Sequence, residues 1–136
     1  MNKIIIDSGP LIALFDSGDR YHNDSIEFIK NNKKTLVSTI PVITEVIYIL
    51  DFNINAQLDF LEWIYRGGIE IVDINKDDIF RIKELMKKYS DRPMDFADGS
   101  LVAVSEKTGT NFIASIDTDF DIYRLHNRKK FKNVFR

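Results

Sequence analysis

The sequence predicts an α/β fold in which a mainly parallel sheet of about five strands lies between two layers of helices. Short runs of β-type residues alternate along the chain with longer segments that have a helical pattern of apolar residues. This alternation is typical of three-layer α/β/α domains, because each helix returns the chain to the start of the next parallel strand. No repeat, linker or low-complexity tract interrupts the pattern, so we expect a single domain over residues 1–136.

The expected strands are short and rich in branched apolar residues. They cover residues 3–6, 36–38, 69–72, 112–116 and 133–135, of which the last is the weakest. The first is predicted to be buried because its core, Ile4-Ile5-Ile6, has no polar side chain.

Five helices are expected between or after these strands. They cover residues 24–32, 42–50, 56–65, 75–89 and 94–107, and Gly9-Pro10 indicates a further helix entry after Asp7. The helix at 75–89 has the clearest signals, since Asn75 can cap it and its apolar residues form one stripe. The helix at 94–107 is apolar on most faces, so we expect it to be buried, with Ala97, Gly99 and Ala103 allowing close approach of its neighbours.

Composition excludes several classes of protein. The 136 residues are 44% hydrophobic and 29% charged, as in ordinary globular domains. No apolar run approaches the roughly 18 residues of a membrane span, and no signal peptide is visible, so we expect a cytoplasmic protein without a membrane partner. The absence of cysteine excludes disulfides, cysteine-ligated zinc and thiol nucleophiles.

The basic residues are unevenly distributed. The net charge is −2, but the segment 123–136 has no acid and carries six basic side chains: Arg124, Arg128, Lys129, Lys130, Lys132 and Arg136. If Asp7, Glu45, Asp95, Asp98, Asp117 and Asp119 are set aside as a metal site, 15 acids remain, and the 19 basic residues exceed them by four. We predict RNA contact by Arg124, Lys129 and Lys130, and the alternative is a solvated final strand and turn.

Several acids fall where a parallel sheet presents its ligand-binding edge. Asp7 ends the first expected strand and Asp117 the fourth, and the carboxyl ends of parallel strands meet at one edge. Asp95 and Asp98 are three residues apart near the start of the buried helix, so they share a face. Glu45 has apolar neighbours within its helix, and an acid in such a setting is paired or functional.

Each acid also has a purely structural explanation. Asp7 and Asp95 suit helix starts, Asp117 suits a turn, and Glu45 could pair with a lysine. Converging carboxylates repel one another, however, and either take up protons or bind a cation. With oxygen ligands alone the expected ion is Mg²⁺ or Mn²⁺, which can activate a water for phosphate-ester hydrolysis. Neither His22 nor His126 lies near these acids in sequence, so zinc is not expected.

Four segments together resemble the PIN-domain nucleases, and within them the VapC-like toxin ribonucleases. They are Ile4-Ile5-Ile6-Asp7-Ser8-Gly9-Pro10-Leu11-Ile12-Ala13-Leu14, Thr44-Glu45-Val46, Met94-Asp95-Phe96-Ala97-Asp98-Gly99-Ser100-Leu101-Val102-Ala103 and Ile116-Asp117-Thr118-Asp119-Phe120, the last followed by Tyr123-Arg124. Each segment is a weak pattern alone, but the four occur in order and on the expected elements, and the resemblance spans the chain.

The resemblance implies roles for individual residues. Asp7, Glu45, Asp98 and Asp117 match the four core catalytic and metal-binding acids, and Asp95 and Asp119 match further acidic positions of the metal site. Ser8 matches a hydroxyl beside the first acid, which either contacts substrate or forms a turn hydrogen bond. Gly99 stands where relatives usually have alanine. The resemblance also implies an Mg²⁺- or Mn²⁺-dependent endoribonuclease that leaves a 5′-phosphate, forms a homodimer and often pairs with an antitoxin.

Three alternatives remain open on the sequence. A phosphoacceptor domain of the response-regulator type would use Asp73, which follows the expected strand 69–72, but would leave Glu45 and Asp98 unexplained. A PIN fold that binds RNA or a partner without cutting would not need the full acidic set. A phosphatase that attacks through Asp7 usually has a second aspartate two residues later, where this chain has Gly9.

Overall fold

Five parallel strands form the centre of the protein. The computed structural model describes residues 2–136. The strands are β1 (Lys3–Ile6), β2 (Thr35–Ser38), β3 (Glu70–Ile71), β4 (Phe112–Ala114) and β5 (Lys132–Asn133), and their order in the sheet is β3-β2-β1-β4-β5. Every neighbouring pair is parallel, so β1 lies in the middle and the predicted parallel α/β architecture is confirmed.

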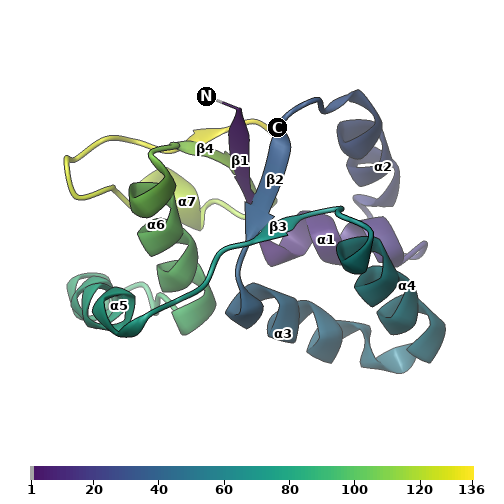
Figure 1. The fold of residues 1–136 in the computed structure, drawn as a ribbon, viewed down its shortest axis with the longest axis horizontal. Helices are drawn as coiled ribbons and strands as arrows, with labels where there is room; N and C mark the ends of the chain where they lie inside the picture. The colour runs from purple at the N-terminus through teal and green to yellow at the C-terminus, as the bar shows by residue number, and fades with distance from the viewer. Residues whose placement is uncertain (1) are drawn as a thin grey trace.

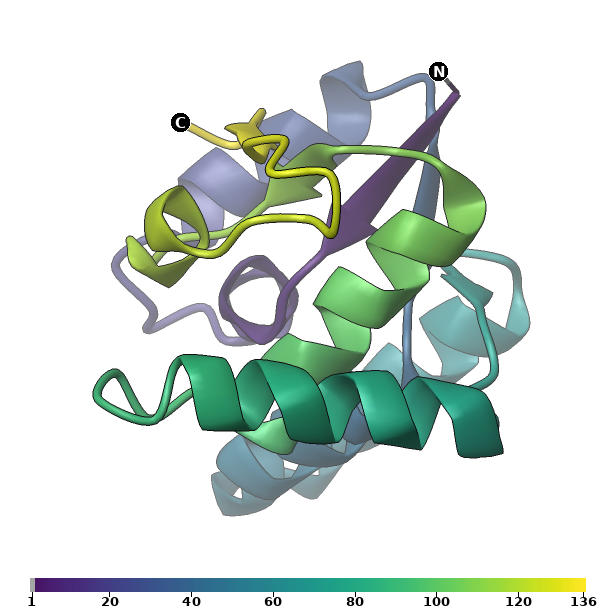
Figure 2. The ribbon, with the colours of Figure 1, turned by 90° about the vertical axis from the view of Figure 1, so that its left-hand side faces the viewer.

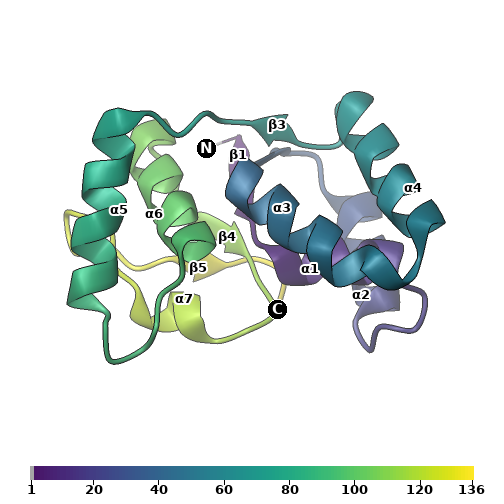
Figure 3. The same ribbon diagram turned by 90° about the horizontal axis from the view of Figure 1, so that it is seen from below.

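The helices enclose this sheet on both faces. They are α1 (Ser8–Phe15), α2 (His22–Asn31), α3 (Ile40–Ile49), the 3₁₀ turn η1 (Leu50–Phe52), α4 (Ile54–Tyr65), α5 (Lys76–Lys88), α6 (Phe96–Thr108) and the short α7 (Asp119–Ile122). Helices α5 and α6 lie on one side of the sheet, and α1, α2 and α4 lie on the other (Figure 1). Helix α3 crosses beneath the carboxyl ends of the strands, as the view from below shows (Figure 3).

The boundaries of the elements follow from capping. Asn75 and Asp78 form a capping box at the start of α5, and Asp95 accepts the backbone N–H of Asp98 at the start of α6. Gly109, with φ of 77°, ends α6 in the left-handed conformation that favours glycine. Most predicted boundaries are therefore within two residues of those observed, whereas η1 and α7 were not predicted.

The fourth strand is shorter than predicted. It ends at Ala114 rather than at Ile116, because Ser115 turns away to pair with a side chain. The backbone N–H of Ser115 donates to Oδ1 of Asn133 at 3.3 Å, and the carbonyl of Ser115 accepts from Nδ2 of Asn133 at 2.9 Å. Asp117 consequently lies in a loop beyond β4, and not directly on the strand end.

Helix α6 packs between the sheet and α5, as Figure 2 shows. Eight of its residues are buried, which confirms that it is a core helix. Gly99 makes the close approach of α5 possible, since a β-carbon at this position would lie 2.7 Å from Cγ2 of Ile82. Packing therefore explains why this chain has glycine at position 99, where relatives usually have alanine. No helix over residues 2–136 combines the length and apolarity required to cross a membrane.

Candidate active site

Asp7 is the most buried acid at the carboxyl edge of the sheet, with 3% of its surface exposed. Its backbone N–H donates to the carbonyl of Ala114 at 3.0 Å, so the ends of β1 and β4 are joined. Its Oδ1 accepts the N–H of Ser8 at 2.8 Å and caps α1, and its Oδ2 accepts the hydroxyl of Ser115 at 3.1 Å. The pKa of Asp7 is raised to about 7, first by burial and then by the negative charges of Asp117 and Glu45.

Asp98 lies in the first turn of α6 and is half-buried. The hydroxyl of Tyr123 donates to its Oδ2 at 3.1 Å. Burial raises the pKa of Asp98 to about 8, and repulsion from Asp7, Asp95 and Asp117 adds to this effect. The charge of Asp7 therefore acts on Asp98, although the two acids lie on different elements.

Asp117 follows β4 in an exposed turn, where its Oδ1 accepts the N–H of Asp119 at 3.0 Å. Its pKa is raised by partial burial and by the charge of Asp119, and Arg136 opposes this shift. The guanidinium of Arg136 lies 3.4 Å from the carbonyl of Asp117 and 3.3 Å from Oδ1 of Asp121. Arg136, which the sequence showed only as part of the basic segment 123–136, thus lies beside the acids.

Glu45 belongs to the same group of acids, although it comes from α3. Its charge contributes to the raised pKa of Asp7. Within residues 2–136 it makes no ion pair, so the lysine pairing considered for it is not formed. It lines a shallow hollow between α3 and the start of α6, together with Thr44, Tyr48, Asp95 and Phe96.

A buried hydroxyl pair joins the start of α3 to α6. Oγ1 of Thr39, the residue that caps α3, lies 2.7 Å from Oγ of Ser100 in α6. Ser38 donates its hydroxyl to the carbonyl of Ile6 at 3.0 Å and ties the end of β2 to the end of β1. These contacts hold the elements that carry Glu45, Asp98 and Asp7 in a fixed relation.

The two additional acids have structural partners as well as electrostatic effects. Asp95 is exposed and caps α6 by accepting the N–H of Asp98 at 2.8 Å. Asp119 begins α7. Asp95 raises the pKa of Asp98 and of Asp117, and Asp119 raises that of Asp117, so both acids belong to the electrostatic environment of the site.

The donor set suits a hard divalent cation, but the side chains do not form a ready-made cage. Over the described part of the chain, no three acidic or histidine side chains are close enough to hold an ion together. The acids instead act on one another through their charges, and burial and repulsion disfavour their negative charge. Oxygen ligands with this uncompensated charge fit Mg²⁺ or Mn²⁺, and the site contains no nitrogen or sulfur ligand that would select zinc.

The predicted substrate-binding residues are placed differently. Ser8 lies next to Asp7 at the start of α1 and is half-buried. Arg124 directs Nη1 to the carbonyls of Asp121, Ile122 and Tyr123 at 2.7–3.0 Å, so this part of its guanidinium is used in holding the end of α7.

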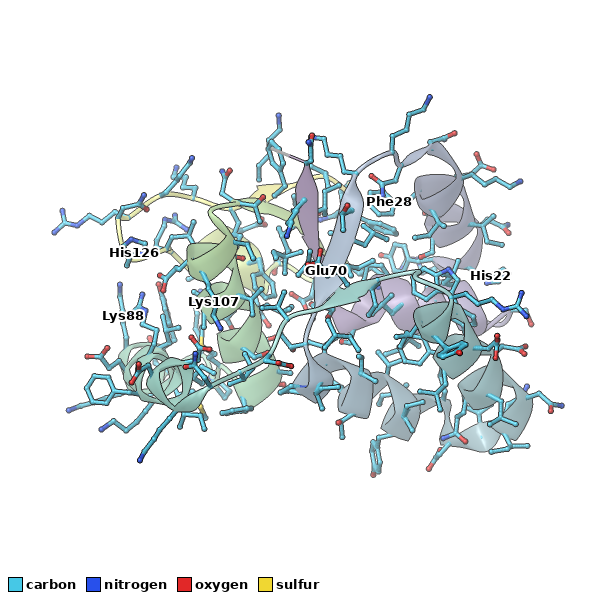
Figure 4. The ribbon with its side chains drawn as sticks, viewed as in Figure 1. His22, Phe28, Glu70, Lys88, Lys107 and His126 are labelled. Atoms are coloured by element: carbon cyan, nitrogen blue, oxygen red, sulfur yellow. The ribbon has the colours of Figure 1, made fainter. Side chains whose placement is uncertain are left out.

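Lys129 and Lys130 are exposed in the loop before β5. The carbonyl of Lys130 accepts a hydrogen bond from Asn111, which precedes β4, whereas Asp117 follows β4. The structure therefore places both lysines at the opposite end of this strand from the acids. His126, labelled in Figure 4, lies in the same loop beside α6, where its N–H donates to Glu106.

The sequence matches the family described as PIN domain over residues 4–125. This chain belongs to the PIN domain family. It is 26% identical over 116 residues to Ribonuclease VapC26 of Mycobacterium tuberculosis, covering 84% of this chain and 86% of the relative. The resemblance to VapC-like members of the PIN domain family is confirmed by this match.

Solved structures of other proteins share the fold. VapC20 of Mycobacterium tuberculosis, described as a toxin that cleaves the sarcin–ricin loop, matches with a TM-score of 0.80 at 18% identity, over 88% of this chain and 93% of that one. A toxin–antitoxin complex from Klebsiella pneumoniae matches with a TM-score of 0.64 at 16% identity, over 85% and 88% of the two chains. VapBC2 of Rickettsia felis, bound to a DNA fragment from its promoter, matches with a TM-score of 0.60 at 15% identity, over 87% and 90%.

The strand order argues against the phosphoacceptor alternative. Doubly wound domains of that type place β3 beside β1, in the order 2-1-3-4-5. Here β3 pairs only with β2 at the edge of the sheet. Asp73 is exposed beyond this edge strand, and the whole of β2 separates it from the strand that carries Asp7.

Proposed function

We propose that this PIN-domain protein is an Mg²⁺- or Mn²⁺-dependent endoribonuclease and the toxin of a type II toxin–antitoxin pair. The observation that carries the proposal is the pair Asp7 and Asp98, two buried or half-buried acids at the carboxyl edge whose pKa values are raised by burial and by the charges of neighbouring acids. Such a pair is costly to maintain unless a cation or a reaction uses it. The match to a ribonuclease of the same family supports RNA as the substrate.

The residues of the site have different roles in this proposal. Asp7, Glu45, Asp98 and Asp117 would hold the ion, with Asp95 and Asp119 adding negative charge around it. A bound divalent ion supplies positive charge that activates water and stabilises the departing oxygen of a phosphodiester. The hydroxyl of Ser115 and the backbone N–H of Ser8 hold the carboxylate of Asp7 in place, and we expect the hydroxyl of Ser8 to contact a phosphate oxygen of the substrate. We expect hydrolysis to leave a 5′-phosphate.

Cleavage of RNA by the purified chain tests this function. The protein should cut RNA with Mg²⁺ or Mn²⁺, and EDTA should stop it. Asp7→Asn should abolish cleavage, because the amide keeps the shape of the side chain but removes the charge that attracts the ion. Asp73→Asn is the matched control, since Asp73 is exposed at the far edge of the sheet and its loss should leave cleavage unchanged.

The outcomes separate this function from the alternatives. Cleavage that survives both EDTA and Asp7→Asn would end the metallonuclease proposal. Binding of RNA without cleavage, across several RNAs and both ions, would favour a PIN fold that binds without cutting. Growth arrest of a bacterial host by the unchanged chain, but not by Asp7→Asn, would support the toxin role.

The partner proposal rests on an exposed apolar surface, which we call the α3–α4 face. It consists of Tyr48, Ile49, Phe52, Ile54, Leu58, Leu61 and Tyr65, all exposed, from Ile49 at 45% to Tyr65 at 87%. These residues follow one another along α3, η1 and α4 (Figure 1). Ile54, Leu58, Leu61 and Tyr65 recur at the spacing of one helix face, and exposed apolar surface of this kind marks protein–protein contact in ordinary globular proteins.

We propose that a second copy of the chain covers this face in a homodimer, and that a small antitoxin is a further partner. The matched toxin–antitoxin complexes support the antitoxin. Light scattering should give twice the chain mass of 15.8 kDa, and the double variant Phe52→Ser/Leu58→Ser should give a monomer. Ile79→Ser, which removes an exposed apolar side chain on α5, is the control and should remain dimeric. A monomeric unchanged chain would refute the homodimer.

A further inference from the structure

Tyr123 is a fully buried residue with a hydroxyl that reaches the candidate site. None of its surface is exposed. Its hydroxyl donates to Oδ2 of Asp98 at 3.1 Å, which is a side-chain hydrogen bond between the segment after α7 and the first turn of α6. No hydrogen bond to Oδ1 of Asp98 is formed within residues 2–136, so one carboxylate oxygen is held and the other is free.

The tyrosine is itself held rigidly. Its ring meets Phe120 edge-on, with centroids 5.2 Å apart, and meets Tyr89 at 5.0 Å. The hydroxyl of Tyr89 accepts the backbone N–H of Arg124 at 3.0 Å, and the guanidinium of Arg124 holds the carbonyl of Tyr123 at 3.0 Å. The ring of Tyr123 is thus fixed by packing against Phe120 and Tyr89, which gives its hydroxyl a defined position, whereas the hydroxyl of Tyr89 serves the backbone of Arg124.

We propose that Tyr123 is a positioning residue, whose hydroxyl fixes the carboxylate of Asp98 in the orientation that binds the divalent ion. The inference rests on the proposed function, because it takes Asp98 to be a metal ligand. Tyr123 would act on the metal site without being one of its acidic ligands. Groups that orient metal ligands typically contribute a factor of about 10–100 to metal affinity.

A purely structural role for Tyr123 makes a different prediction. A buried hydroxyl needs an acceptor, and any acceptor would satisfy it. If the bond served only to satisfy the tyrosine, its loss would change stability and leave metal affinity unchanged. If the bond orients Asp98, its loss changes metal affinity and depends on Asp98 being present.

The matched variants Tyr123→Phe and Tyr89→Phe distinguish the two roles. Each removes one hydroxyl from the same aromatic cluster and keeps the ring. Binding of Mn²⁺ to the full chain, measured by titration calorimetry, should weaken about 10–100-fold in Tyr123→Phe. In Tyr89→Phe the affinity should be unchanged and the melting temperature should fall, because the N–H of Arg124 loses its acceptor.

A double-mutant cycle then tests whether the effect passes through Asp98. In an Asp98→Asn background, adding Tyr123→Phe should weaken Mn²⁺ binding no further, since the carboxylate that the hydroxyl orients is gone. The unchanged protein supplies a measurement that needs no variant to fold. With ring-labelled tyrosine, Mg²⁺ should shift the NMR signal of Tyr123 and leave that of Tyr65, which is exposed on α4, in place.

Three results would overturn the role of Tyr123. Equal Mn²⁺ affinity of Tyr123→Phe and the unchanged protein would overturn the inference while leaving the metal site standing. Equal weakening by Tyr89→Phe would also overturn it, since packing and not the hydroxyl would then be responsible. Failure of the unchanged protein to bind Mn²⁺ or Mg²⁺ would overturn the proposed metal site and, with it, this inference.

Discussion

Ser115 donates its hydroxyl to Oδ2 of Asp7 at 3.1 Å, and so links the residue after β4 to the acid at the end of β1. Both residues are buried, and the bond runs between positions that are remote in sequence. A hydroxyl that donates to a carboxylate favours the charged form. Ser115 therefore opposes the effect of burial, which raises the pKa of Asp7.

Replacing Ser115 with alanine should raise the pKa of Asp7 further. A net hydrogen-bond free energy of about 0.5–1.5 kcal/mol corresponds to a shift of roughly half a unit to one unit. The acidic limb of the pH–rate profile for RNA cleavage should move to higher pH by that amount. Ser105→Ala is the control, because Ser105 is a buried serine of α6 whose hydroxyl has no hydrogen-bond partner among residues 2–136. An unmoved profile in Ser115→Ala would show that this bond does not tune Asp7.

The stability of the metal-free protein should fall as the pH rises. Asp7 and Asp98 have folded-state pKa values of about 7 and about 8, above the ordinary value of 3.8. The folded state consequently keeps protons that the unfolded state has released. This contribution to stability is fully present below about pH 4 and is lost as the pH rises through the two folded-state values. Melting temperatures in EDTA from pH 5 to pH 8.5 measure the effect.

Two controls identify the acids responsible. Asp7→Asn and Asp98→Asn should each flatten the decline of melting temperature with pH, since the amide carries no charge at any of these values. Adding Mg²⁺ should raise the melting temperature more at pH 8 than at pH 5.5, because the ion binds the deprotonated acids. A melting temperature in EDTA that rises steadily between pH 5 and pH 8.5 would contradict the assigned shifts.

The acids could be found from the sequence because each lies in or directly after a readable local pattern. Asp7 follows an all-isoleucine strand core, and Asp98 begins a helix that is apolar on most faces. Local patterns of this kind determine where elements begin and end, and parallel topology then brings the strand ends to one edge. The shared environment of Asp7, Asp98 and Asp117 agrees with that reasoning.

The groups that tune the acids could not be found in the same way. Ser115, Tyr123 and Arg136 act on acids through contacts set by packing. Tyr123 follows the fourth family segment and Arg136 belongs to the basic segment 123–136, but neither pattern indicates which acid the residue contacts. The prediction that β4 continues to Ile116 was wrong, because the end of this strand is set by the distant side chain of Asn133, which binds the backbone of Ser115. Long-range partners of single polar groups have no periodic signal in a sequence.

Gly99→Ala tests the close packing of α6 against α5. The added methyl would lie 2.7 Å from Cγ2 of Ile82, so the isoleucine side chain or one of the two helices must shift. Overpacking costs about 1–3 kcal/mol, and the better helix propensity of alanine offsets roughly 1 kcal/mol of this. We expect the free energy of unfolding to fall by about 1 kcal/mol in urea titrations.

Two further variants make that measurement specific. Gly99→Ala combined with Ile82→Ala should lose less stability than the sum of the single changes, because the new methyl occupies part of the space that isoleucine leaves. Gly18→Ala, at an exposed turn with room for a methyl, should change stability little. Strict additivity of the two α5–α6 changes would show that the close contact is not the source of the loss.

Lys129 and Lys130 provide a test of how far the RNA extends over the protein. The two lysines lie at the end of β4 opposite Asp117, in the loop at the upper left of Figure 1. An RNA short enough to occupy only the carboxyl edge cannot reach them from the acids. Lys129→Ala/Lys130→Ala should therefore leave cleavage of a short RNA unchanged, and weaken binding of a longer structured RNA.

The salt dependence shows whether the weakening comes from phosphate contacts. Each lost contact should reduce the slope of log affinity against log salt by about 0.7–0.9, so the double variant should lose up to twice that for the longer RNA. The rate at saturating RNA should stay the same, because phosphate contacts position the substrate without taking part in the chemistry. Lys33→Ala/Lys34→Ala, a pair of exposed lysines between α2 and β2, is the matched control. An unchanged slope for every RNA length in Lys129→Ala/Lys130→Ala would refute substrate binding by this loop and leave it as a solvated turn.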